Sequence, residues 1–220
     1  MSWDAKTLSR IEHNEIAFVE HQRGARAALH GATLLTARVA EVPGWNFAGA
    51  VRTSDGKAGQ LVDAVEAHFA GHGRPACFRL NPLTEPRGFA QALRERGYRP
   101  AVALSSMVLD GKIAPREEGV TVRRVHDTED LVRFTETQCA GFGMPDSWRP
   151  WLDEVNARCA ARAEFAYYLA ELDGRPAGVS LALEAPHGVW GVYAVTTLEA
   201  CRRRGVTRAI FARIAADAGD

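Results

Sequence analysis

The spacing of apolar residues predicts a chain of interleaved helices and strands. Between Lys57 and Ala70, for example, Leu61, Val65 and Phe69 recur at the spacing of one buried helix face. Capping and turn residues mark the ends of other such stretches. The expected helices span residues 9–23, 57–70, 86–96, 127–140, 147–159 and 204–217.

Strands are expected where β-branched and other apolar residues run between turn signals. Residues 120–125 alternate valines with Thr121 and Arg123, and the Asp173-Gly174 pair favours a tight hairpin between two apolar runs. Helices interleaved with strands predict an α/β (α+β) fold in which helices pack on a sheet. The expected strands span residues 32–39, 47–52, 76–80, 102–109, 120–125, 165–172, 177–183 and 189–195, with turns at 43–44 and 186–188.

A charged stretch rich in Gly and Pro, DGKIAPREEG at residues 110–119, separates two patterned regions. Such a composition is typical of a linker. We therefore expect two modules, residues 1–110 and 120–220, joined by a linker at residues 111–119.

Composition and charge narrow the classes of function. The 27 Lys and Arg residues balance 27 Asp and Glu residues, so the chain has no net positive charge with which to hold a nucleic acid. The longest apolar stretch, residues 101–109, is too short to span a membrane, and the first residues lack the apolar core of a signal peptide. The 4 cysteines form no CxxC pair, which is typical of free thiols in a reducing compartment. We expect a cytoplasmic protein without nucleic-acid or membrane partners.

Two pairs of side chains are weaker candidates for chemistry. His68 and His72 share one expected helix face at a spacing that metal ligands use, but no third ligand accompanies them, so a charge role at the helix end is favoured and no metal is expected. Trp148 and Trp151 either line a binding pocket or pack in the core.

A basic turn joins the strand at 189–195 to the last expected helix, and its sequence at residues 202–208 is RRRGVTR. The unpaired N–H groups of a helix start carry partial positive charge, a glycine lets backbone approach a ligand closely, and arginines add charge. A diphosphate fits these requirements, although a solvated basic surface is the alternative on local features alone. A nucleoside triphosphate or NAD is disfavoured because neither GK[ST] nor GxGxxG is present.

The stretch at residues 167–216 contains YYLAELDGRPAGVSLAL and VYAVTTLEACRRRGVTRAIF. It resembles the GNAT family of acyl-CoA N-acyltransferases, in which a strand pair around a "dG.paG" turn precedes a strand ending in Val and a diphosphate loop of pattern [Q/R]xxGx[G/A]. Arg202 and Gly205 match this loop, whereas Thr207 stands where Gly or Ala is usual. The resemblance runs from Val120 to the end and implies a mixed, mostly antiparallel sheet flanked by helices.

The resemblance also implies an acetyl-CoA site. Backbone N–H groups from Arg203 to Arg208 would bind the diphosphate, and the edge of the strand near Tyr193 would pair with pantetheine. A backbone N–H near Val195 would polarise the thioester carbonyl. The co-substrate-binding residues implied in this way are Tyr193, Ala194, Val195, Arg202, Arg203, Arg204, Gly205, Val206, Thr207 and Arg208.

The implied activity is transfer of an acetyl group from acetyl-CoA to a primary amine of a small molecule or protein, by direct attack in a ternary complex. A base or a water chain must take the proton of the attacking amine. Glu171, Glu184, His187 and Tyr193 are candidates for the base, each equally interpretable as a surface or packing residue, so the catalytic residues stay open.

Residues 1–110 resemble the closing part of the same fold, with Gly97-Tyr98 as the turn before its final strands. The turn at residues 52–57 lacks the diphosphate pattern, so this module is expected to be degenerate and not to hold CoA. The C-terminal module is expected to lack the strands that follow the loop helix, which leaves the edge of the strand at 189–195 open. The alternative functions are therefore a catalytically impaired acyl-CoA-binding module and an interaction protein, with a homodimer covering that edge.

Overall fold

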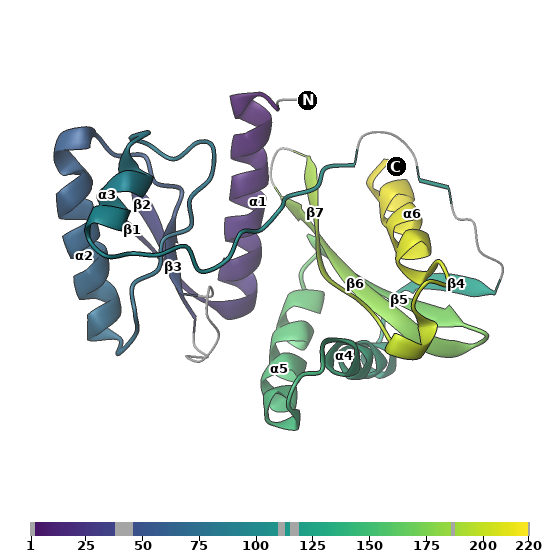
Figure 1. The fold of residues 1–220 in the computed structure, drawn as a ribbon. Coiled ribbons are helices and arrows are strands. Elements are labelled where there is room, and N and C mark those ends of the chain that lie inside the picture. Colours follow the sequence, from purple (N-terminus) through teal and green to yellow (C-terminus); the bar gives the residue numbers. More distant parts are fainter. Residues whose placement is uncertain (1–2, 38–45, 110–112, 115–118, 186–187, 220) are drawn as a thin grey trace. The chain divides into compact units, whose positions relative to one another are not determined.

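The structure is a computed structural model that describes residues 3–37, 46–109, 113–114, 119–185 and 188–219 (Figure 1). The chain divides into two compact units, Met1–Ser106 and Met107–Asp220. Each unit combines helices with an antiparallel sheet, which confirms the expected mixed fold class. Within the described ranges no helix is long and apolar enough to cross a membrane.

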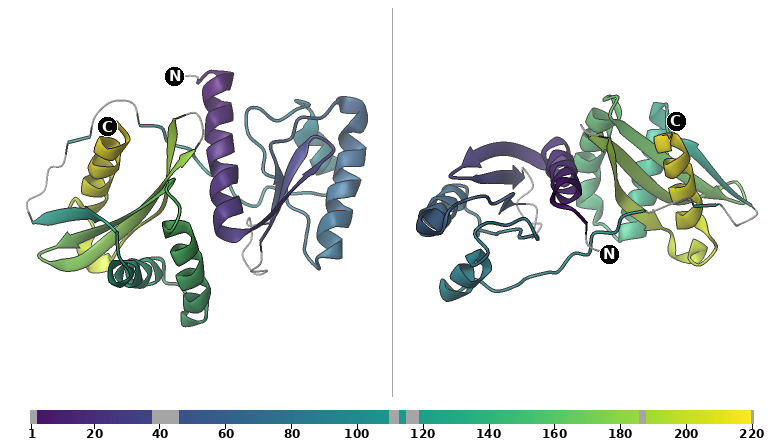
Figure 2. Two further views of the ribbon diagram at one scale, coloured as in Figure 1. Left: turned by 180° about the vertical axis from the view of Figure 1, so that it is seen from behind. Right: turned by 90° about the horizontal axis from the view of Figure 1, so that it is seen from above.

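The C-terminal unit consists of β4 Val120–Arg124, α4 Thr128–Phe142, α5 Arg149–Ala160, β5 Phe165–Leu172, β6 Arg175–Ala185, β7 Val189–Thr197 and α6 Val206–Gly219, with short 3₁₀ turns at Asp146–Trp148 and Glu199–Cys201. Its strands form one sheet in the order β4-β5-β6-β7, and every neighbouring pair is antiparallel. Helices α4 and α5 cover one face of this sheet and α6 covers the other (Figures 1 and 2). The hairpin around Asp173-Gly174 forms as predicted.

Alternate residues of β5 fill the core on the two faces of this sheet. Tyr168 lies in the same buried cluster as Ile210 and Ile214 of α6. Tyr167 faces the other way, and its ring meets Phe134 of α4 edge-on with 4.8 Å between the ring centroids. Complete burial of a large apolar side chain contributes about 1.5–3 kcal/mol. Because both faces are buried, a slip of one residue would exchange every side chain, so the register of β5 is strongly fixed.

The N-terminal unit consists of α1 Ala5–Arg23, β1 Gly24–Leu29, β2 Ala32–Ala37, β3 Phe47–Gly49, a 3₁₀ turn at Asp55–Lys57, α2 Ala58–Gly71 and α3 Phe89–Glu95. Its sheet has the order β1-β2-β3 and is antiparallel. After α2 the chain returns, and Phe78 forms an isolated parallel bridge with Ala48 of β3. Leu61 and Phe69 of α2 are completely buried in the core of this unit.

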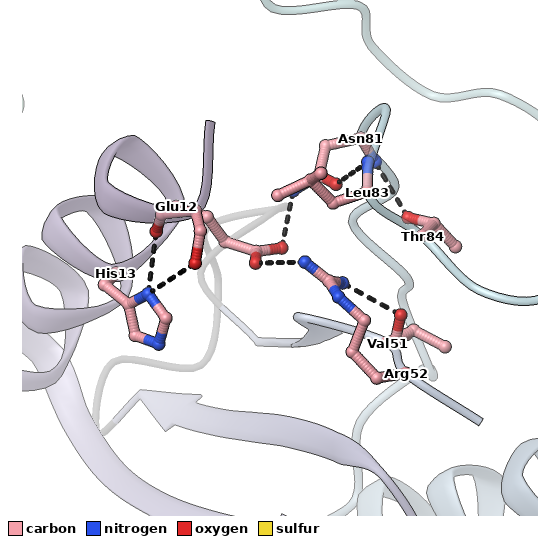
Figure 3. Close-up of polar contacts among 8 residues, drawn as sticks. Glu12, His13, Val51, Arg52, Asn81, Leu83 and Thr84 are labelled. Atoms are coloured by element: carbon pink, nitrogen blue, oxygen red, sulfur yellow. Dashed lines mark hydrogen bonds and ion pairs between the residues drawn. The ribbon is translucent and has the colours of Figure 1, made fainter. Parts of the chain in front are cut away.

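A buried carboxylate ties α1 to the rest of the N-terminal unit (Figure 3). Glu12, with 7% of its side chain exposed, accepts from Nη2 of Arg52 at 2.7 Å and from Nδ2 of Asn81 at 2.5 Å. Arg52 also donates through Nη1 to the Val51 carbonyl at 2.9 Å. A carboxylate buried alone would be costly, so the guanidinium and the amide are what make this position tolerable. Arg52 is thus a structural residue.

Each predicted helix is present, with ends that differ by a few residues, but in the N-terminal half two predicted strands do not form and one strand was not predicted. Residues 76–80 make one bridge instead of a strand, because their backbone hydrogen bonds to β3 are confined to Ala48. Residues 101–109 have no regular secondary structure and are exposed, with Met107 at 89%. The alanine-rich β1 was not predicted, since only its pairing along β2 makes it a strand. The turn expected at residues 43–44 lies outside the described residues, as do positions 186–187.

Candidate functional site

The carboxyl-terminal half of β7 contains a β-bulge. The register with β6 shifts between Val179 and Leu181, so that Ser180 lies opposite two residues of β7, Ala194 and Val195. Ala194 has a φ of +51°, in the left-handed region, which costs a non-glycine residue about 1–2 kcal/mol. A bulge redirects backbone groups out of the regular ladder. The strand therefore presents amide groups here in directions that a flat strand does not.

The second edge of β7 has no pairing strand among the described residues. β7 pairs with β6 on one side, and no strand in the described part of the chain pairs with its second edge. Val192 on this strand is 37% exposed, and Tyr193 to Val195 are partly exposed. Unpaired N–H and C=O groups on a strand edge bind extended chains by strand addition.

The loop that follows β7 ends in the N-terminus of α6. Arg203 and Gly205 have φ values of +63° and +74°, and the first backbone bond into α6 runs from the Ala209 N–H to the Gly205 carbonyl at 2.9 Å. Among the described residues, the N–H groups of residues 203–208 meet no hydrogen-bond acceptor. Together with the helix dipole, these groups form a site suited to an anion.

The start of α6 is held against the end of β7. The Thr197 and Thr207 hydroxyls are 2.9 Å apart and hydrogen-bonded. On the neighbouring strand, a Cβ on Gly178 would stand 2.7 Å from the Thr196 carbonyl oxygen and 2.8 Å from Cγ1 of Val206. Only glycine therefore allows α6 to approach the sheet this closely. The Thr207 side chain, at the position where the sequence departs from the diphosphate-loop pattern, is part of this attachment.

The far end of α6 is anchored as well. The Tyr168 hydroxyl, on a buried ring, donates to Oδ2 of Asp217 at 2.9 Å, and Asp217 also accepts from Nε of Arg213 at 2.8 Å. Burial, and then the bond to Asp217, raises the pKa of Tyr168 above its ordinary value. The phenol thus stays protonated as a donor, and α6 is fixed to the sheet at both ends.

The arginines of the loop are held only loosely by the protein. Nη2 of Arg204 lies 3.2 Å from Oδ2 of Asp173, with 53% and 68% of the two side chains exposed, a geometry that contributes little to stability. Arg202 and Arg208 each donate through Nε to a single backbone carbonyl, at 3.4 Å and 2.9 Å. A guanidinium has five N–H donors, so each retains donors for an anion.

The structure thus brings together the two groups of residues for which a role in binding acetyl-CoA was predicted. Tyr193 to Val195 carry the bulge and the open edge of β7, and residues 202–208 form the loop and helix start that follow. Gly205 has a left-handed backbone, so it has a conformational reason to be glycine in addition to close approach. The binding roles themselves stay predictions.

The candidates for the general base are not brought together. Oε1 of Glu171 lies 3.4 Å from Nη2 of Arg123, in an ion-pair network between β4 and α4. Glu184 is exposed opposite Trp190, and Tyr193 is partly exposed on β7. His187 lies outside the described residues. The structure therefore favours none of them.

Trp148 and Trp151 lie at the start of α5, where their rings pack edge-to-face with 6.4 Å between centroids. Both are partly exposed, in contrast to the buried Leu152 beside them. This position is compatible with either of the roles that the sequence left open.

Three small residues that support the site were given no role by the sequence analysis, although Gly178 lies in the DGRPAG stretch that carries the resemblance. Gly178 admits α6, Ser180 lies opposite the bulge, and Gly141 of α4 touches β7, since a Cβ there would stand 2.2 Å from Oγ1 of Thr196. Each is a small or polar residue among larger or apolar neighbours in the sequence, and that contrast was the only indication of it in the sequence. What each contacts depends on the packing of distant strands and helices, which the pattern does not specify.

The two histidines of α2 bond to the protein. Nε2 of His68 lies 2.9 Å from Oγ1 of Thr36, and Nδ1 of His72 lies 2.8 Å from the His68 carbonyl oxygen. Burial, and then the neighbouring His72, lowers the pKa of His68. No group of three or more His, Cys, Asp or Glu side chains in the described ranges is arranged to hold a metal ion.

Comparison with known proteins connects this site to a fold. No protein-family model matches the chain, and a search of curated proteins returns no match. Among solved structures, a GCN5-related N-acetyltransferase from Kribbella flavida is similar over 96% of this chain and 80% of its own, with a TM-score of 0.69 and 19% identity. A functionally unknown conserved protein from Staphylococcus epidermidis is similar over 90% of this chain and 81% of its own, with a TM-score of 0.59 and 10% identity. The chain thus has the GNAT fold, as the motif resemblance predicted.

Proposed function

We propose that the protein is an acyl-CoA N-acyltransferase that transfers an acetyl group from acetyl-CoA to a primary amine of a small molecule or protein. The observation that carries this proposal is the sequence of features at one end of β7. A bulged strand with an open edge leads directly into a helix N-terminus surrounded by loosely held arginines. These are the two complementary surfaces that a thioester on a long, diphosphate-bearing carrier requires.

In this proposal the diphosphate binds the N–H groups of residues 203–208, with charge from Arg202, Arg203, Arg204 and Arg208. The pantetheine arm adds to the open edge of β7 at residues 193–195 as an extra strand. This places the thioester carbonyl beside the bulge, where a fixed backbone N–H stabilises negative charge on its oxygen. The protein's GNAT fold supports this arrangement.

The reaction is a direct displacement. The amine nitrogen attacks the thioester carbon, and the C=O electron pair moves to the oxygen, where the backbone N–H holds it. The C–S bond then breaks as the carbonyl reforms, so that an amide and a thiolate result. The nitrogen loses one proton and the thiolate gains one, which balances the reaction without any cofactor.

Thermal unfolding of the full chain with and without acetyl-CoA tests the binding step. A ligand at 100 times its Kd stabilises the native state by about 2.7 kcal/mol. Arg203→Glu reverses a loop charge and should abolish this shift. Arg99→Glu changes the net charge equally at an exposed position of the N-terminal unit and should leave the shift intact. The absence of a shift in the folded wild-type protein would contradict the proposal.

Binding of acyl-CoA without turnover is the second candidate function. It is favoured by one observation: the carboxylate of Glu171, a candidate base, is engaged with Arg123 and Arg133 at 3.4 and 4.0 Å. A screen of primary amines with labelled acetyl-CoA separates the two functions. Labelled amide supports the acyltransferase, whereas saturable binding with no product from any amine supports the binding module.

A further inference from the structure

Ser180 is a polar residue in an unusual place. It lies in the middle of β6, its side chain is completely buried, and it stands opposite the bulge of β7. Its Oγ donates to the Tyr193 carbonyl oxygen at 3.0 Å, while a second carbonyl, that of Leu181, lies at the 3.5 Å limit. A buried hydroxyl contributes to stability only when it is bonded, so the bond to Tyr193 explains why a hydroxyl is tolerated here.

This hydrogen bond fixes the direction of one peptide group. The Tyr193 carbonyl must point toward β6, because Oγ of Ser180 lies on that strand. The only cis peptide bond among the described residues is Glu85-Pro86, so the bond from Tyr193 to Ala194 is trans. In a planar trans peptide the C=O and N–H point in opposite directions. The Ala194 N–H therefore points away from β6, toward the open edge of β7.

The backbone conformation at this position supports a functional interpretation. Ala194 adopts a φ of +51° although it is not glycine, and strain of this kind persists only where the surrounding structure enforces it. The buried bond from Ser180 is one such constraint on the peptide that precedes Ala194. A donor held rigidly at the edge of the strand matches the requirement for stabilising an oxyanion without reorganisation.

We infer that Ser180 is a positioning residue for acyl transfer, because it holds the Tyr193 carbonyl toward β6 and thereby directs the Ala194 N–H to the thioester oxygen. The inference rests on the proposed function and adds to it the identity of the donor and of the residue that orients it. Ser180 itself is buried behind the strand and acts only through the backbone of β7.

The C=O stretching band of bound acetyl-CoA, labelled with ¹³C at the carbonyl, reports on this donor directly. A hydrogen bond to the carbonyl oxygen lowers the stretching frequency relative to acetyl-CoA in buffer, and the wild-type 220-residue chain should show this shift. Ser180→Ala should lose most of the shift while keeping the Kd for acetyl-CoA. Ser180→Cys fills the same space with a weaker donor and should keep part of it.

Tyr168→Phe is the matched control. Tyr168 is the residue that faces Ser180 across β5 and β6, is equally buried, and also loses a hydroxyl bond when changed, but to Asp217. The Tyr168→Phe variant should retain the full shift of the carbonyl stretching band. If Ser180→Ala and Ser180→Cys both keep the wild-type shift, or if Tyr168→Phe loses it equally, the role of Ser180 is overturned while the proposed function stands. If the folded wild-type protein does not bind acetyl-CoA, both fail together.

Discussion

The junction between β7 and α6 and the junction between β3 and α2 share an order of elements and differ in their surroundings. In each, an antiparallel strand is followed by a short 3₁₀ turn and a helix, and an alanine has a positive φ: +51° at Ala194, in the bulge of β7, and +47° at Ala50, directly after β3. The outer edge of β3 is occupied by the chain itself. The Ala48 N–H donates to the Cys77 carbonyl at 2.8 Å, and the Arg79 N–H donates to the Ala48 carbonyl at 2.9 Å.

The arginines of the two junctions differ in the same way. Arg52 is committed to the buried Glu12, whereas Arg204 has only an exposed contact with Asp173. The β3–α2 junction therefore stabilises its unit, because the chain pairs with the outer edge of β3 and the charge of Arg52 is neutralised by a buried carboxylate. The β7–α6 junction has neither feature among the described residues, which is why we propose it as the ligand site.

Arg52→Ala should cause the largest loss in the free energy of unfolding, and this loss distinguishes the β3–α2 junction from the β7–α6 junction. It leaves the Glu12 carboxylate, 7% exposed, without a cation. Removing one partner of a fully buried pair costs about 3–5 kcal/mol, and the partial exposure of Arg52 reduces this to about 2–3 kcal/mol. Arg203→Ala should change the free energy of unfolding by less than about 0.5 kcal/mol. Urea denaturation checks both, and equal losses would refute the division into structural and ligand-binding arginines.

Gly178→Ala should give an intermediate effect on both stability and binding. The new methyl group meets the Thr196 carbonyl oxygen and Val206, which overpacks the start of α6 and costs roughly 1–2 kcal/mol. Because α6 must shift, the affinity for acetyl-CoA should fall as well. Gly56→Ala, in the turn before α2, meets no atom within 4 Å and should leave both unchanged. Calorimetric titration with acetyl-CoA would disprove this if the two variants bound equally well.

Replacing the strained alanines should give the smallest effect. Ala194→Gly and Ala50→Gly each relieve a left-handed conformation, which raises the free energy of unfolding by up to about 1 kcal/mol after the entropic cost of glycine. Similar increases in the free energy of unfolding, measured by chemical denaturation, would show that both alanines are strained. A gain at Ala50 alone would show that the bulge of β7 is not strained, contrary to our description.

The helices and the strands of the C-terminal unit could be predicted from the sequence, because burial of one face produces a periodic spacing of apolar residues in both kinds of element. The sequence also located the basic loop at residues 202–208, because the arginines and the glycine that define it are adjacent in the chain. It did not predict β1, which becomes a strand only by pairing, or the pair of Glu12 with Arg52, which are 40 positions apart. The hydrogen bond from Ser180 to the Tyr193 carbonyl was equally hidden, since a bulge exists only relative to the register of the neighbouring strand.

The close contacts on both sides of the end of β7 have a consequence for the thermodynamics of recognition. Gly141 admits α4 against Thr196 on one face, and Gly178 admits α6 against the other. A strand held this tightly has already lost its conformational freedom when the chain folds. The entropy of ordering this strand is therefore spent before any ligand arrives, so a ligand that binds there, such as the proposed acetyl-CoA, would not have to offset that entropy from its interaction free energy.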